Sequence, residues 1–204
     1  MLAVYLYIKF RNLTVRAKST PVNNTDRQYD KAVIDCKDIF LKKTRDYGTS
    51  WRVLRTISIA DQLYIKARRI RTLQQTREQR VGEDKKGEFI AMVNYGVIGL
   101  IQLSLGADNP EELSPGEAER QYDAKAAQAR SVMQDKNHDY GEAWREMSQD
   151  SFVDLILMKI LRIRQILAND GATLISEGID SNFTDIVNYS IFALILIGEG
   201  QHSA

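Results

Sequence analysis

Apolar residues recur along this chain at the spacing of helices. In two segments they fall at i, i+4, i+7 and i+11, which places them on one face of an amphipathic helix. These residues are Tyr29, Val33, Cys36 and Phe40 in the first segment and Tyr122, Ala126, Ala129 and Met133 in the second. Residues 89–105 and 183–197 are apolar on nearly every face, which is typical of buried central helices.

The ends of the helices have signals of their own. Each amphipathic segment reaches an Asp-Tyr-Gly string, at 46–48 and 139–141, where glycine can take the left-handed conformation that ends helices. A short helix is expected to follow each string, around the tryptophan, and then a longer one over about 60–79 or 153–168. Ser114 and Pro115 are typical of a helix start, as N-cap and first helical residue.

The chain contains an internal duplication. Lys-x-x-Asp-Tyr-Gly-x-x-Trp-Arg at 43–52 returns at 136–145, and Lys-x-x-Arg-Ile-Arg at 66–71 returns at 159–164. Each half has one fully apolar helix and is too small to bury an adequate core alone. We therefore predict a tandem duplication of a roughly four-helix unit, with the two central helices packed about a pseudo-twofold axis in one domain.

The predicted boundaries are repeat 1 at 25–106, a connector at 107–117 and repeat 2 at 118–200. Residues 1–24 form an N-terminal extension, predicted to be a poorly ordered arm. Leu2 to Phe10 alternates as a strand does, but it has no second strand to pair with. The predicted fold class is all-α.

Composition excludes several kinds of chemistry. The 204 residues carry 28 basic and 27 acidic side chains, and this balance argues against a nucleic-acid binder. One cysteine and two histidines exclude an intramolecular disulfide, a cysteine zinc cluster and a histidine-rich metal site. No uninterrupted apolar run approaches the ~20 residues of a membrane span, and no signal peptide is recognisable. We expect a cytoplasmic protein that works with carboxylates, amides and cations.

Among the polar residues of the two most apolar helices, an aspartate and two asparagines are candidates for function. Asn94 and Asn188 occupy matched positions, and Asp185 lies one turn before Asn188, on the same face. A buried amide is costly unless it is hydrogen-bonded, so a structural role across the helix pair is one reading. The other is a site in which these oxygens bind Mg²⁺ or a substrate amine. Repeat 1 has Ala91 at the position of Asp185, so such a site would be asymmetric.

A pair of cations lies on one face of the helix before each central helix. The pairs are Lys66 with Arg69 and Lys159 with Arg162. Together they could grip a phosphate, since arginine offers a bidentate fork. The alternative is a solvated face, or ion pairs with Asp61 or Asp154.

The longest matched string also has two interpretations. It is either a helix stop with an aromatic anchor, or a loop that presents a lysine, an aspartate and a tryptophan to a planar, charged ligand. The residues concerned are Lys43, Asp46 and Trp51 in repeat 1 and Lys136, Asp139 and Trp144 in repeat 2.

Three strings resemble the nucleotide modification associated domain 1 family, formerly a domain of unknown function. They are Lys-Asn-His-Asp-Tyr-Gly-Glu-Ala-Trp-Arg (136–145), Asp-Leu-Ile-Leu-Met-Lys-Ile-Leu-Arg-Ile (154–163) and Phe-Thr-Asp-Ile-Val-Asn-Tyr (183–189). The resemblance covers roughly residues 26–197. It implies a link to phage and bacterial systems that make or process modified nucleotides.

The 185–189 string is also distantly similar to all-α MazG-like nucleoside triphosphate pyrophosphohydrolases, in which helical carboxylates bind Mg²⁺ around a triphosphate. This chain departs from their second acidic motif, with Asn182 in place of a glutamate and Ala91 in place of the aspartate in repeat 1. The preceding helix also lacks their Glu-x-x-Glu pair.

The resulting hypothesis is an enzyme that binds or hydrolyses a small-molecule nucleotide, a (deoxy)nucleoside triphosphate, in a cleft between the repeats. The matched lysines and arginines would hold the phosphates, and Asn94 and Asn188 would orient the base or sugar. Asp185 would hold Mg²⁺, which activates water, with help from Asp139, Asp154 or Glu177. A non-catalytic nucleotide-binding or regulatory module is the alternative, and a purely structural or oligomerisation domain is a third reading. No membrane partner is expected, and a homo-oligomer is compatible with the sequence.

Overall fold

A computed structural model describes residues 24–76, 84–106, 112–175 and 177–204. All regular elements in these ranges are helical, which confirms the predicted fold class. They are α2 (Asn24–Tyr47), η1 (Ser50–Val53), α3 (Thr56–Thr76), α4 (Lys85–Leu105), α5 (Pro115–Tyr140), η2 (Ala143–Glu146), α6 (Gln149–Ala168) and α7 (Ile179–Gly198). The predicted N-terminal arm up to residue 23 and the connector residues 107–111 lie outside the described residues.

The predicted helix ends follow from local chemistry. Gly48 and Gly141 come directly after α2 and α5 and have φ values of +65° and +60°, which a residue with a Cβ rarely adopts. The Ser114 side chain accepts a hydrogen bond from Glu117 N, as an N-cap does. However, α3 and α6 each begin four residues before the predicted start. The first turn of α6 is largely polar and that of α3 alternates Thr and Ser with Ile, so neither shows a clear helical apolar period.

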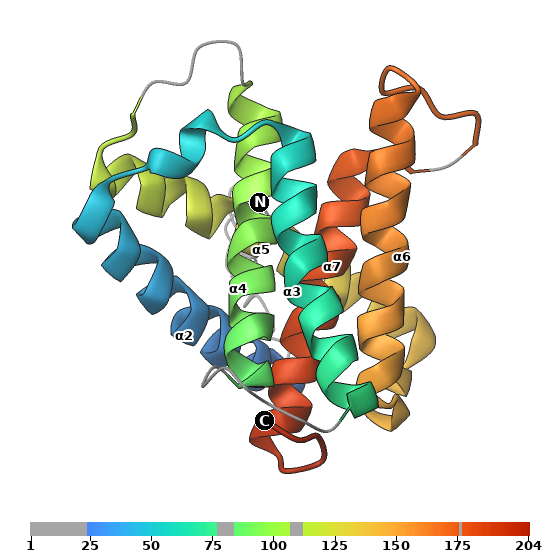
Figure 1. Cartoon of the computed structure of the whole chain (residues 1–204). Coiled ribbons are helices and arrows are strands. Elements are labelled where there is room, and N and C mark those ends of the chain that lie inside the picture. The colour runs from blue at the N-terminus through green and yellow to red at the C-terminus, as the bar shows by residue number, and fades with distance from the viewer. Residues whose placement is uncertain (1–23, 77–83, 107–111, 176) are drawn as a thin grey trace, which may run out of the picture.

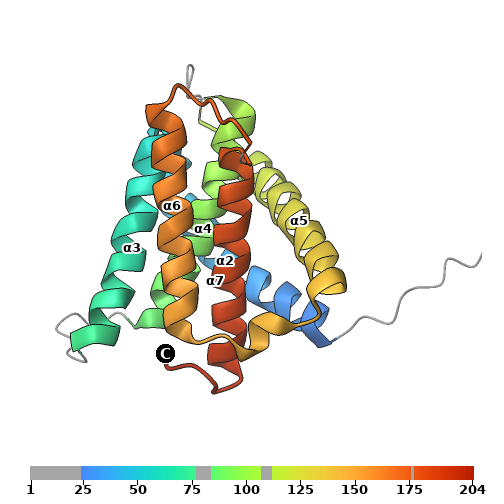
Figure 2. The same cartoon turned by 90° about the vertical axis from the view of Figure 1, so that its right-hand side faces the viewer.

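The helices form three layers. The central pair, α4 and α7, runs antiparallel and shares more contact than any other pair (Figure 1). α3 and α6 lie on one side of this pair, and α2 and α5 cross its other side (Figure 2). Gly96 and Gly99 permit the close central packing, because a Cβ on either would come within 3 Å of a Val187 or Phe183 side chain.

Reciprocal hydrogen bonds tie the repeats together. Tyr29 on α2 donates its hydroxyl to Asn188 Oδ1 on α7 across 2.7 Å, and Tyr122 on α5 donates to Asn94 Oδ1 on α4 across 2.8 Å. Each asparagine Nδ2 also donates to a main-chain carbonyl in its own repeat. These carbonyls are Cys36 O at 3.0 Å and Ala129 O at 3.1 Å. The oxygen and the nitrogen of each asparagine amide are therefore hydrogen-bonded within the protein, as the structural interpretation expects. A role for these amides in orienting a ligand stays a prediction.

Helices α4 and α7 are also long and apolar enough to cross a membrane, by length and composition alone. In their most apolar windows, 67% and 78% of the residues are buried inside the molecule. This burial places their apolar residues in the protein core.

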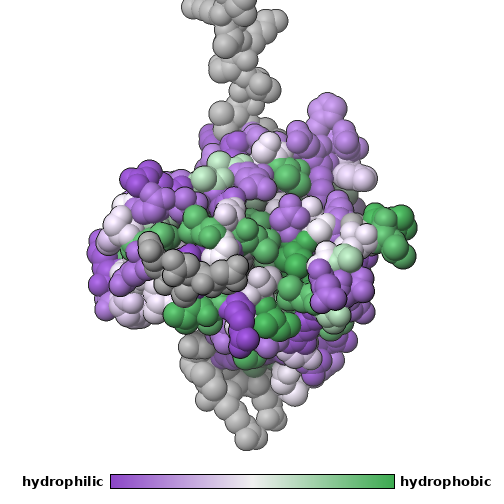
Figure 3. Space-filling view, turned by 90° about the horizontal axis from the view of Figure 1, so that it is seen from above, coloured by the Kyte–Doolittle hydropathy of each residue, from purple (hydrophilic) through white to green (hydrophobic). Residues whose placement is uncertain are grey.

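Exposed apolar side chains gather at the end of the molecule where α4 ends and α3 begins (Figure 3). They are Val53, Ile57, Leu103 and Leu105, with Leu174 and Ile175 in the loop between α6 and α7. The opposite end of the molecule carries a cleft lined mostly by polar side chains. The two ends therefore differ in surface chemistry.

Candidate functional site

In repeat 2, the predicted carboxylate and both predicted lysines lie together. Asp185 Oδ1 is 2.6 Å from Lys136 Nζ on α5, and its Oδ2 is 2.5 Å from Lys159 Nζ on α6. The side chains of Asp185 and Lys159 are 6% and 9% exposed, whereas that of Lys136 is 47% exposed. Two cations from different helices thus compensate one buried anion, as a buried charge requires.

The charges of this cluster extend to Tyr189, one turn further along α7. Burial raises the pKa of the Tyr189 phenol and the Asp185 charge raises it further, while Lys136 and Arg162 act in the opposite direction. Burial lowers the pKa of the Lys136 ammonium, but its hydrogen bond to Asp185 and the charge of that carboxylate raise it overall. Lys136 therefore remains a cation at neutral pH.

The predicted Mg²⁺ ligands do not converge on one point. Asp139 is exposed and pairs with His138, and Asp154 is exposed and lies 3.6 Å from Arg71. Within the described ranges, no group of three or more His, Cys, Asp or Glu side chains is arranged to hold a metal ion. Both Asp185 oxygens contact lysine Nζ atoms, and an Mg²⁺ site at the predicted carboxylates stays a prediction.

Repeat 1 holds its buried carboxylate at a different position. Glu88 on α4 pairs with Lys66, at 3.2 Å, and with Arg69. It is 2% exposed and lies one turn before Ala91, at the position that Asn182 occupies in repeat 2. The sequence analysis missed Glu88, although an acidic residue at the start of an apolar helix was the signal that could have revealed it.

Repeat 1 also contains a pocket of about 270 Å³ between α2, η1 and α4. Of the predicted site residues, Lys43, Trp51 and Asn94 line it, together with Ala91 and Tyr95. Tyr47, Tyr95 and Trp51, together with Ile98, give the pocket aromatic and apolar walls beside Lys43. We call this space the repeat-1 pocket; its lining residues are Ile39, Phe40, Lys43, Thr44, Tyr47, Gly48, Ser50, Trp51, Leu54, Gly87, Ile90, Ala91, Asn94, Tyr95 and Ile98.

In repeat 2 larger side chains stand at two of the matched positions. Asp185 replaces Ala91, and Phe192 replaces Ile98. The Phe192 ring stacks on Trp144, with ring centroids 4.2 Å apart and an angle of 5° between the planes. The repeat-1 pocket is therefore a difference between the halves, although the surrounding backbone elements are the same.

Within the described residues, the remaining predicted residues form no ion pair with Asp185, although the charges of Arg162 and Glu177 act on Tyr189. Asp46 is exposed near the end of α2. Arg162 and Glu177 line a separate groove by the loop between α6 and α7, where Asn182 also lies. The structure therefore brings Asp185, Lys136 and Lys159 together but leaves the other predicted carboxylates outside that contact.

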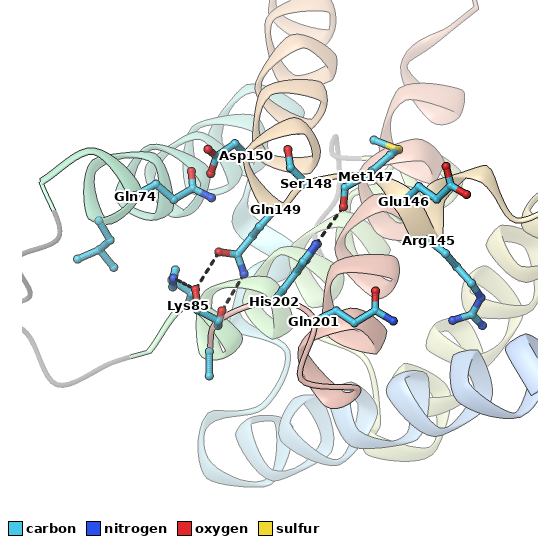
Figure 4. A pocket seen from close by; sticks show the side chains of 13 residues that line it. Gln74, Lys85, Arg145, Glu146, Met147, Ser148, Gln149, Asp150, Gln201 and His202 are labelled. Carbon is cyan, nitrogen blue, oxygen red and sulfur yellow. Dashed lines mark hydrogen bonds between the residues drawn. The ribbon is translucent and has the colours of Figure 1, made fainter.

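A cleft of about 860 Å³ lies between the repeats, at the end of the molecule near the C-terminus. Figure 4 shows its polar lining, in which Gln149 Nε2 donates to Ser203 O across 2.7 Å and His202 Nε2 lies 3.0 Å from Met147 O. Lys85 also donates to the Ser203 hydroxyl. None of the predicted site residues lines this cleft.

The sequence model of nucleotide modification associated domain 1 matches residues 43–103 and again residues 136–197, which together make up more than half of the chain. The chain belongs to the nucleotide modification associated domain 1 family. Searches of curated proteins and of solved structures found no match. The more distant similarity to MazG-like enzymes therefore stays a prediction.

The two family matches follow the duplication. Each match to nucleotide modification associated domain 1 begins at a matched lysine, Lys43 or Lys136, and ends inside a central helix. One family unit thus contains the end of an amphipathic helix, the 3₁₀ turn with its tryptophan, and the two helices that follow. We call Asp185, Lys136 and Lys159 the Asp185 cluster. Both this cluster and the repeat-1 pocket lie largely within the residues that the family model matches.

Proposed function

We propose that this protein binds a small-molecule nucleotide without hydrolysing it, as a binding or regulatory module. The observation that carries this choice is the state of Asp185, whose two oxygens are both in contact with lysine Nζ atoms. A carboxylate held in this way is poorly placed to hold Mg²⁺ as well, because the ion would have to displace two buried or half-buried cations.

Family membership supports the nucleotide part of the proposal. Its chemical support is a set of cations and aromatic side chains within the matched residues. Lys43 has no carboxylate partner among the residues that the structure describes, and Trp51 and Tyr95 lie in the same pocket. A phosphate suits such a cation, and a planar base suits such rings.

The test is to incubate the full chain with a panel of deoxynucleoside mono- and triphosphates, with Mg²⁺ or with EDTA, and to measure both melting temperature and nucleotide turnover. We expect at least one nucleotide to raise the melting temperature in both conditions, without turnover. If no nucleotide raises it, the binding proposal is wrong. Mg²⁺-dependent turnover that Asp185→Asn abolishes would instead show that the protein is a nucleotide hydrolase that depends on Asp185.

A further inference from the structure

The matched lysines Lys136 and Lys43 differ in what lies next to them. In repeat 2, α5 places Lys136 Nζ 2.6 Å from the Asp185 carboxylate on α7. In repeat 1, α2 carries the matched Lys43 and α4 carries Ala91 where the carboxylate would stand. Both residues line the repeat-1 pocket. The pocket therefore contains the cation of the pair without its anion.

No other carboxylate of the described ranges takes the place of Asp185. Glu88 lies one turn away and is held by Lys66 and Arg69 on α3. Glu112 lies against Gly48 at the edge of the pocket, but no ion pair joins it to Lys43. An incoming anion would consequently meet a lysine whose charge no ion pair within the described ranges compensates.

The walls favour a planar group beside that anion. Trp51 is buried, and its Nε1 has no hydrogen-bond partner in the described part of the chain. Trp144 Nε1 also has none, but Phe192 covers that ring by stacking, whereas Trp51 lines open space. Tyr47 and Tyr95 add two further rings to the lining. The pocket thus offers stacking surface to an aromatic ligand, while the Trp51 Nε1 atom is itself buried.

We propose that the repeat-1 pocket binds a nucleoside monophosphate, with its phosphate in the position that the Asp185 carboxylate occupies in repeat 2. The identity of the ligand rests on the proposed function; the position of its anion rests on the matched residues. The volume of about 270 Å³ lies just below the range of roughly 300–1,000 Å³ for drug-sized ligands, which favours a single phosphate over a longer chain.

The experiment measures the affinity of the full chain for the four deoxynucleoside 5′-monophosphates and for the matching nucleosides by isothermal titration calorimetry. Ala91→Asp places in the pocket the carboxylate that repeat 2 already accommodates, and we expect it to lower monophosphate affinity at least tenfold. Ala91→Asn is the matched control, because it has the same size without the charge, and its loss should be several-fold smaller.

Lys43→Met should lower monophosphate affinity to that of the nucleoside and leave nucleoside affinity unchanged. Lys43→Arg should restore most of the binding, and Lys42→Met should have little effect, since Lys42 is exposed and already paired with Asp38. Circular dichroism and melting temperature verify that each variant is folded.

The outcomes separate the two proposals. If the wild type binds a nucleotide and Ala91→Asp and Lys43→Met bind it equally well, the pocket assignment is wrong and the proposed function stands. Equal losses in Ala91→Asp and Ala91→Asn overturn the placement of the phosphate, because they indicate crowding instead of charge. If the wild type binds no nucleotide, the proposed function fails and this assignment fails with it.

Discussion

The two halves of this protein use the same elements to build different sites. In repeat 2 a buried aspartate holds two lysines, and an aromatic stack fills the space beside them. In repeat 1 the carboxylate lies one turn earlier and pairs with Lys66, the match of Lys159, and with Arg69, which leaves Lys43 beside an open pocket. The difference teaches that the matched lysine forms an ion pair where a carboxylate faces it, as Lys136 does, and that within the described residues Lys43, which lines the pocket with Ala91, has no such pair.

The largest effect should come from removing the buried anion of repeat 2. Asp185→Ala leaves the nearly buried Lys159 without a partner, and breaking a buried pair in this way costs about 3–5 kcal/mol of unfolding free energy. Glu88→Ala in repeat 1 should cost less, because Lys66 and Arg69 are 27% and 21% exposed and can reach water. Urea denaturation measures both values.

A double variant provides the control for this pair. Asp185→Ala with Lys159→Met removes the stranded charge together with its partner, and we expect it to recover much of the lost stability. A cost for Glu88→Ala equal to that for Asp185→Ala would contradict the difference in burial between the two carboxylate sites.

The reciprocal tyrosine bonds predict an effect that is equal in the two halves. Tyr29→Phe and Tyr122→Phe each remove one hydroxyl from a buried asparagine acceptor, and each should cost about 1–2 kcal/mol. Chemical denaturation of the two single variants tests this. A cost for one variant that is more than twice the cost for the other would show that the pseudo-twofold axis does not extend to the energetics.

Exchanging the matched residues Phe192 and Ile98 should change stability in opposite directions in the two repeats. Phe192→Ile removes the ring that stacks on Trp144 and should lower stability by about 1 kcal/mol. Ile98→Phe adds a ring next to the repeat-1 pocket and should raise stability by roughly 0.5–1 kcal/mol, as cavity-filling substitutions do. Thermal melting compares them, and a destabilising Ile98→Phe would mean that the pocket is too small for the ring.

The smallest effect distinguishes the two matched lysines. Lys136→Met should cost a few tenths of a kcal/mol, because a half-exposed ion pair contributes little, whereas Lys43→Met should cost nothing measurable. The pKa of Lys136 is raised in the folded state, so its contribution is present below the unfolded value of about 10.4 and is lost as pH rises through the folded value. Denaturation at pH 8 and pH 11 should show a smaller difference at pH 11 than at pH 8.

Much of the fold could be predicted because its signals are local. The apolar period gave the helices, and Gly48 and Gly141 gave the ends of α2 and α5. Asn94 and Asn188 were recognised as unusual, but their tyrosine partners could not be inferred, since Tyr29 lies 159 positions from Asn188. The spacing of apolar residues shows which face of a helix is buried, but it does not show which side chain of another helix packs against that face.

The candidate site was harder to predict for the same reason. The cations of α3 and α6 were identified, yet the expected partner Asp61 pairs with Arg164, while Glu88 holds Lys66 and Arg69. The repeat-1 pocket had no sequence signal, because it results from side-chain volume that is missing at Ala91 and Ile98. The pocket can be recognised only when the structure shows that α2, η1 and α4 surround these two positions.

The reciprocal bonds of Tyr29 and Tyr122 also determine how folding depends on dilution. Each amphipathic helix finds its asparagine on the central helix of the other repeat. Two separate half-chains would have to meet in a bimolecular step, and their stability would fall as the sample is diluted. Joining them in one chain gives each half a fixed local concentration of the other, in the millimolar range for short linkers. Within the single chain this encounter is unimolecular, so it does not weaken on dilution.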